Sequence, residues 1–186
     1  MLPLARQFVC LSGVALKSVS QFNGHGKVSM NIWTDTERGA PGGREAIREY
    51  VDAVGDADPE INAIIERGAW RDTSPPADDV EAIGELAEAV GRTPRRCYRN
   101  AREVAGAAGR DDVRYVEGIA VPATVPVATK HAWVEVDGSV IEVTWEDTPV
   151  PGEGSAYYGV AIELDTVLET VNDRGTDGPV ITEVDR

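Results

Sequence analysis

Three residues in the second half of the chain have side chains that could form a nucleophilic centre: Cys97, His131 and Glu142. A thiol becomes a strong nucleophile when a neighbouring base takes its proton, and imidazole is the side chain that does so near neutral pH. A carboxylate beside the imidazole fixes its tautomer and stabilises its charged form. These residue types therefore suit attack on a carbonyl carbon, provided that the fold brings them together.

One predicted hairpin places His131 beside Glu142. Asp137-Gly138, which lies between two alternating runs, is a strong hairpin signal because a type I′ turn needs two positive φ angles. With these two residues as the loop, Trp133 faces Glu142, and His131 becomes a diagonal neighbour of Glu142 on the same face. Their backbones are then roughly 7 Å apart, so a side-chain hydrogen bond is within reach. The alternative is a solvent-facing hairpin whose polar side merely includes a histidine.

Cys97 lies close to the start of a predicted helix that opens at Thr93-Pro94. A helix N-terminus and nearby cations both lower the pKa of a thiol, and Arg95, Arg96 and Arg99 are adjacent. Three arginines in a first turn oppose the helix dipole, which is locally unfavourable. The arrangement is easier to explain if Cys97 is a thiolate there. The alternatives are an inert buried cysteine and arginines that pair with acidic neighbours.

The elements that must position these residues are helices first and strands later. The predicted helices carry Ile47 to Val54 before Gly55, Ile61 to Ile65 after Asp58-Pro59, Val80 to Val90 before Gly91, and Thr93 to about Gly109. The predicted strands are Val113 to Val121, His131 to Val136, Val140 to Trp145 and Tyr157 to Ile162, followed by a short helix over Leu164 to Val171. Helices followed by an antiparallel sheet indicate an α+β fold.

Composition sets apart an atypical N-terminal extension (1–29). The order of the predicted elements then gives a helical part (30–92), a core that carries the three candidate residues (93–174) and a tail (175–186) that is either an edge strand or disordered. The extension contains no Asp or Glu but both Phe residues. It is a mis-called start, with Met30 the true beginning, a signal-like segment, or a flexible arm. We favour the first, which makes the protein cytoplasmic; a genuine signal peptide would make it secreted.

Charge and composition exclude several classes of function. The net charge is −14, with 32 acidic residues beside 15 Arg and three Lys, which argues against nucleic-acid binding. Such a surface is typical of proteins from salt-loving organisms, with an ordinary acidic domain as the alternative. No apolar run is long enough to indicate a membrane partner. Two Cys and two His are too few for a structural zinc site, and no metal is expected.

In chain order, the motifs resemble the transglutaminase-like superfamily of papain-type cysteine enzymes. That family has a Cys at a helix start, then Arg-x-Val-x-Gly, then His-Ala-Trp-Val-Glu-Val, then Asp-Pro-Thr. This sequence has Cys97, Arg114-Tyr115-Val116-Glu117-Gly118, His131-Ala132-Trp133-Val134-Glu135-Val136 and Glu142-Val143-Thr144. Glutamate thus stands where the family has aspartate. Cys97-Tyr98-Arg99-Asn100-Ala101 also resembles a motif in small proteins of viruses and proviruses.

The resemblance implies a papain-like core and a thiol enzyme with Cys97 as nucleophile, His131 as general base and Glu142 as its orienting acid. The reaction would hydrolyse or exchange an amide bond in a peptide or protein, without a cofactor, and hydrolysis ranks above cross-linking. Asn100, Trp133 and Trp145 are weaker candidates for lining the site, with an outward helical position or the core as alternatives. The alternative function is a non-catalytic binding or virion-associated module on the same fold.

Overall fold

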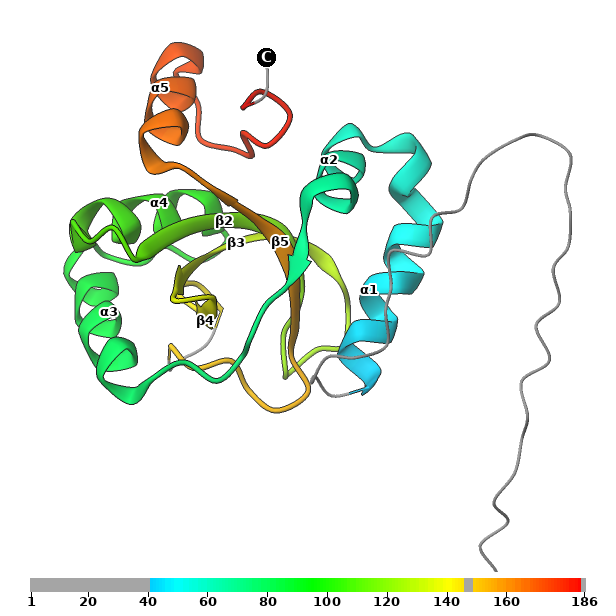
Figure 1. Ribbon diagram of the computed structural model, residues 1–186, viewed down its shortest axis with the longest axis horizontal. Coiled ribbons are helices and arrows are strands. Elements are labelled where there is room, and N and C mark those ends of the chain that lie inside the picture. The colour runs from blue at the N-terminus through cyan, green and yellow to red at the C-terminus, as the bar shows by residue number, and fades with distance from the viewer. Residues whose placement is uncertain (1–40, 146–148, 185–186) are drawn as a thin grey trace, which may run out of the picture. The chain divides into compact units, whose positions relative to one another are not determined.

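The computed structural model describes residues 41–145 and 149–184. The described part has an α+β fold, as predicted (Figure 1). Its elements are α1 (Pro41–Val54), a 3₁₀ turn (Gly55–Ala57), α2 (Pro59–Arg67), β1 (Ala69–Trp70), α3 (Ala77–Ala89), α4 (Cys97–Ala108), β2 (Val113–Val121), β3 (Thr129–Val136), β4 (Ser139–Ile141), β5 (Ala156–Ile162) and α5 (Leu164–Arg174).

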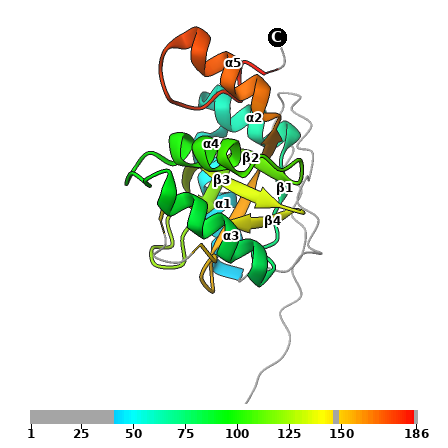
Figure 2. The same ribbon diagram turned by 90° about the vertical axis from the view of Figure 1, so that its left-hand side faces the viewer.

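A single curled antiparallel sheet forms the centre of the fold, with strand order β1-β5-β2-β3-β4. The central strand β2 pairs with β3 on one side and with β5 on the other. Helix α4 packs on β3 and β2, whereas α1 and α2 pack on β2 and β5. Figure 2 shows the same layers from the side. The sheet therefore links the helix that carries Cys97 to the strand that carries His131.

The packing of Trp133 explains two glycines of the sheet. Gly118 and Gly159 face each other across β2 and β5, and a Cβ on either would lie 2.7 Å or less from the Trp133 ring. Such an approach is too close for any side chain, so glycine is required at both positions. Gly118 also faces His131 across the β2–β3 ladder, so the indole and the imidazole occupy the same region of the sheet.

The predicted hairpin between β3 and β4 is confirmed. Asp137 and Gly138 have φ angles of 49° and 84°, and Val134 pairs with Ile141 in the expected register. The predicted length of the second strand is wrong, because β4 ends at Ile141. Beyond it the chain turns, and the edge of β3 beside residues 131 and 132 has no partner from β4.

The predicted end of α1 before Gly55 and the predicted start of α2 at Asp58-Pro59 are confirmed, but the predicted start of the fourth helix is wrong. The Asp58 side chain accepts hydrogen bonds from the first-turn N–H groups of α2 at 3.0 and 3.3 Å. Helix α4 begins at Cys97, not at Thr93, because Arg95 has a left-handed φ of 65° that a helix does not tolerate. Cys97 is therefore the first helical residue.

The segment after α5 forms no strand, contrary to one prediction. It turns back on the domain and buries Val180 and Ile181 at 0% and 1% exposure. The short strand β1 was not predicted; only two residues long, it has no readable alternation. The interpretations of residues 1–29 concern a segment outside the described residues.

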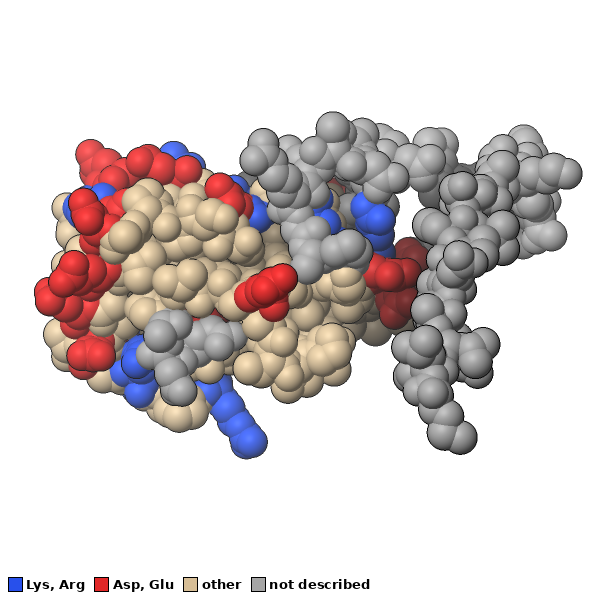
Figure 3. Space-filling model, turned by 90° about the horizontal axis from the view of Figure 1, so that it is seen from below, with Lys and Arg blue, Asp and Glu red and all other residues tan. Residues whose placement is uncertain are grey.

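Charged side chains are unevenly distributed over the domain. In Figure 3 the acidic side chains gather at the end where α3 lies, and a broad uncharged area lies beside them. Helix α3 carries the exposed Glu81, Glu85 and Glu88. Among the described residues, no helix has the length and apolar character needed to cross a membrane.

Candidate active site

His131 lies at the centre of the candidate site and is completely buried. Its Nε2 atom lies 2.9 Å from Oε2 of Glu142, also fully buried. The indole of Trp145 stacks on the imidazole, with ring centres 3.5 Å apart and an interplanar angle of 15°. The imidazole is thus held by a carboxylate at its edge and an indole on its face, which fixes its orientation.

Glu142 is held by donors on both oxygens. Oε1 accepts the backbone N–H groups of Thr144 at 2.7 Å and Trp145 at 3.1 Å, and Oε2 accepts the Tyr157 hydroxyl at 3.1 Å in addition to His131. Burial alone would raise the pKa of this carboxyl. The charge of His131 and the hydrogen bonds nevertheless lower the pKa below its ordinary value. Glu142 is therefore an ionised, oriented carboxylate at neutral pH.

The Cys97 thiol interacts with His131 and with two backbone N–H groups, those of Ala132 and Tyr98. The N–H of Ala132 lies on the edge of β3 that has no partner from β4, because β4 ends at Ile141. This N–H is therefore available to the sulfur of Cys97. Burial alone would raise the pKa of the thiol. The hydrogen bond and charge of His131, with the two N–H groups, lower the pKa below its ordinary value.

The two nitrogens of His131 face different partners. Nε2 is occupied by Glu142, and the buried Nδ1 has no hydrogen-bond partner among the described residues. This leaves Nδ1 for the Cys97 thiol. Burial disfavours the imidazolium, but the Glu142 charge and the hydrogen bonds to Cys97 and Glu142 raise the pKa of His131 to about 9. A lowered thiol pKa and a raised imidazole pKa favour a thiolate–imidazolium pair.

The structure thus brings together the three residues with predicted catalytic roles, and of the weaker candidates it places Trp145 directly against the imidazole. Asn100 is buried, and its amide bonds Thr93 and the Thr144 hydroxyl, so it ties the segment before α4 to the turn that holds Glu142. Trp133 is fully buried in the apolar core of the sheet. Trp145 is partly buried and covers the imidazole.

Two of the arginines near Cys97 are engaged with acidic side chains. Arg96 lies 3.6 Å from Asp177, and Arg99 lies 2.7 Å from Glu103. This matches the alternative in which these arginines pair with acids. The groups that lower the thiol pKa are instead His131 and backbone N–H groups.

Two parts of the site were missed from the sequence. Tyr157 reaches Glu142 because β5 lies next to β2, a long-range pairing that no local pattern indicates. The Ala132 N–H is available because the chain leaves the ladder after Ile141. A β-strand pattern gives the alternation of side chains but says nothing of where a backbone edge becomes free.

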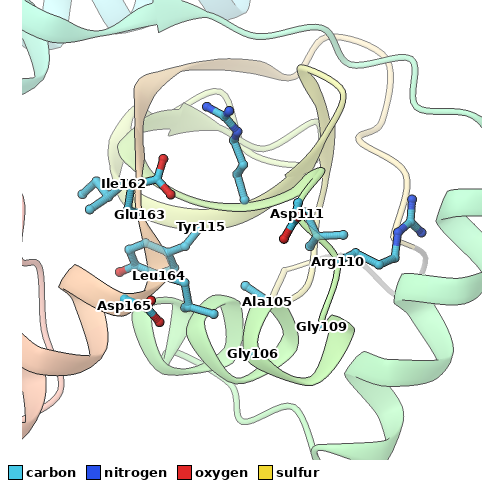
Figure 4. A pocket seen from close by; sticks show the side chains of 12 residues that line it. Ala105, Gly106, Gly109, Arg110, Asp111, Tyr115, Ile162, Glu163, Leu164 and Asp165 are labelled. Atoms are coloured by element: carbon cyan, nitrogen blue, oxygen red, sulfur yellow. The ribbon is translucent and has the colours of Figure 1, made fainter.

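One pocket in the described part of the chain lies away from this chemistry. It has a volume of about 490 Å³ and lies at the C-terminal end of α4, between that helix, β2 and the start of α5 (Figure 4). Ala105, Gly109 and Leu164 are among its lining residues, whereas Cys97 begins the same helix at the opposite end. This pocket is therefore separate from the candidate site.

Among the described residues, no group of three or more His, Cys, Asp and Glu side chains is arranged to hold a metal ion. The comparison with protein-family models found no match to this chain. The searches of curated proteins and of solved structures likewise found no match. The interpretation of the site therefore depends on its own geometry.

Proposed function

We propose that this protein is a thiol-dependent acyl-transfer enzyme that hydrolyses or exchanges an amide bond of a peptide or protein. Cys97 is the nucleophile, His131 the general acid and base, and Glu142 the residue that orients His131. The observation that carries the proposal is the buried imidazole, which binds Glu142 at 2.9 Å through Nε2 and interacts with the Cys97 thiol. A buried histidine–carboxylate pair next to a partly buried thiol, with perturbed pKa values, is typical of a functional site.

The proposed reaction begins with the thiolate of Cys97 and the imidazolium of His131. The sulfur attacks the amide carbonyl carbon, and the carbonyl oxygen takes the electron pair as an oxyanion. The C–N bond then breaks, the amine leaves with the proton from His131, and a thioester forms on Cys97. Water or a second amine then attacks the thioester while His131 takes its proton. The C–S bond breaks and the thiolate–imidazolium pair is restored.

The start of α4 offers a donor for the oxyanion. Cys97 is the first residue of the helix, so its backbone N–H has no intrahelical partner. The helix dipole adds partial positive charge at the same place. A preorganised donor of this kind stabilises the charge that develops on the carbonyl oxygen.

The arrangement of the elements supports a papain-like, transglutaminase-like core as part of the proposal. The cysteine begins a helix that packs on the sheet, the histidine lies on β3, and the acid follows the next strand. Glu142, although one methylene longer than aspartate, binds the imidazole directly. The substitution is therefore compatible with the proposed role of the acid.

Acylation of Cys97 tests this function. In a Cys10→Ser background, the protein is mixed with p-nitrophenyl acetate and with peptide p-nitroanilides, quenched and mapped by mass spectrometry. We expect an early burst of product and an acyl group on Cys97. Cys97→Ser removes the acyl group, and His131→Ala slows its formation by about 10²- to 10⁴-fold. Glu135→Gln is the matched control, because this buried carboxylate on β3 pairs with Arg71.

Slow acylation with equal rates in the original chain and in His131→Ala would contradict the proposal. That result would mean that the thiol reacts without help from the imidazole. It would favour a non-catalytic binding module on the same fold.

A further inference from the structure

The segment that follows α5, residues 175–184, is held against the domain by polar contacts along its length. Asp177 forms ion pairs with Arg102 at 2.6 Å and with Arg96 at 3.6 Å. Arg67 of α2 donates a hydrogen bond to the carbonyl oxygen of Ile181. Figure 1 shows this end of the chain on the same side of the sheet as α2 and α4. We call residues 175–184 the C-terminal segment.

The strongest of these contacts come from a buried carboxylate of the central strand. Glu117 is 1% exposed, and its oxygens accept the N–H of Val180 at 2.8 and 3.0 Å and the N–H of Ile181 at 3.0 Å. The Tyr115 hydroxyl donates a further bond at 2.7 Å. A buried carboxylate without partners is strongly unfavourable. Glu117 is therefore placed to receive two successive backbone N–H groups of a peptide.

The C-terminal segment passes beside the residues that flank the candidate nucleophile. Asp177 binds Arg96, which directly precedes Cys97. Glu117 interacts electrostatically with Tyr98, the residue directly after Cys97. Glu117 also faces Ala132 across the ladder, and the Ala132 N–H is one of the groups that bind the sulfur. The segment therefore lies close to the residues on both sides of the thiol.

We propose that the C-terminal segment occupies in cis the surface on which a substrate peptide lies, and that it limits access to Cys97 while it is docked. This inference rests on the proposed function and names both a regulation and a substrate class. The contacts describe the peptide that this surface accepts. It is a chain with an acidic side chain between Arg96 and Arg102 and, three residues later, two β-branched aliphatic residues that enter a turn and whose N–H groups bind Glu117.

The experiment compares Asp177→Asn with Asp173→Asn, both in a Cys10→Ser background. Asp173 is the matched control, an exposed aspartate on α5 four residues earlier. Cys97 is alkylated with iodoacetamide and with a bulky fluorescein maleimide, and hydrogen exchange is followed at Val180 and Ile181. The ratio of the two alkylation rates cancels the intrinsic reactivity of the thiol and reports access alone.

We expect Asp177→Asn to raise this ratio roughly three-fold and to speed exchange at Val180 and Ile181 by a similar factor, because two ion pairs are lost. A synthetic peptide of residues 175–186 added in trans should lower the ratio again, and a scrambled peptide should not. An unchanged ratio, with or without faster exchange, would overturn the inference. Failure of the proposed function would appear separately, in the pH dependence of iodoacetamide alkylation. In the protein that keeps Asp177, Cys97 would then show the pH profile of an ordinary thiol.

Discussion

His131 and Tyr157 bind the same atom, Oε2 of Glu142, at 2.9 Å and 3.1 Å. The two side chains come from β3 and β5, which lie on opposite sides of β2. Two backbone N–H groups hold the other oxygen, so the carboxylate cannot rotate without losing hydrogen bonds. The orientation of the imidazole is therefore determined by the sheet as a whole, because strands on both sides of β2 contribute to it.

Removing the charge of Glu142 should reduce the fraction of Cys97 that is ionised to the thiolate. In Glu142→Gln, burial would still lower the pKa of His131, while the charge that raises it to about 9 would be gone. The imidazolium would no longer stabilise the thiolate, so we expect alkylation of Cys97 near pH 6.5 to slow by about 10-fold. Glu135→Gln serves as the control because its partner is Arg71. Equal slowing in both variants would show a general loss of packing instead.

The hydrogen bond from Tyr157 to Glu142 should be measurable by a double-mutant cycle. We expect Tyr157→Phe to lower the free energy of unfolding by about 1.5–3 kcal/mol, because the bond is buried and its acceptor is charged. In a Glu142→Gln background, Tyr157→Phe should lower the free energy of unfolding by about 1 kcal/mol less than it does in the original protein. Urea unfolding of the four proteins measures the coupling. Tyr158→Phe, whose hydroxyl bonds Ile65, should show no coupling to Glu142.

Asn100 should prove to be a structural residue of the site. Asn100→Ala leaves the backbone groups of Thr93 and the hydroxyl of Thr144 without their partner. We expect a loss of about 1–3 kcal/mol in the free energy of unfolding, measured in urea. The pH at which Cys97 alkylation reaches half its maximum should stay unchanged in the folded variant. A large shift of that midpoint would contradict a purely structural role and give Asn100 a part in tuning the thiol.

The raised pKa of Glu117 should make the free energy of unfolding decrease as the pH rises. Burial, its largest influence, raises the pKa of this carboxyl to about 7, against about 4.5 in the unfolded chain, although hydrogen bonds from Tyr115, Val180 and Ile181 oppose the change. Between these two values the folded state holds a proton that the unfolded state has lost, so stability decreases as pH rises from about 4.5 to 7. Urea unfolding across this range should give a smaller decrease for Glu117→Gln. An identical slope in both proteins would contradict this assignment.

Local signals in the sequence predicted the parts of the fold that depend on local chemistry. Asp137-Gly138 fixed the hairpin and its register because few sequences adopt two positive φ angles in succession. Asp58-Pro59 predicted the start of α2 because a side-chain cap and a proline both favour a first turn. The hairpin signal was sufficient to predict that His131 and Glu142 lie close together.

The remaining features depend on contacts between distant residues. The end of β4 at Ile141 follows from the turn that wraps around the Glu142 carboxylate, which a strand pattern cannot reveal. The docking of the C-terminal segment on Glu117 joins residues more than sixty positions apart. Both are tertiary contacts, and tertiary contacts routinely override local preference.

The measurement that tests the central claim most directly is the pH dependence of iodoacetamide alkylation at Cys97, made in high salt on the Cys10→Ser protein. The geometry predicts that alkylation stays fast well below pH 7, and that His131→Ala slows it there, because the imidazolium holds the thiolate. Alkylation that rises only near the ordinary thiol pKa of about 8.5, and that is indifferent to His131, would contradict the proposed thiolate–imidazolium pair.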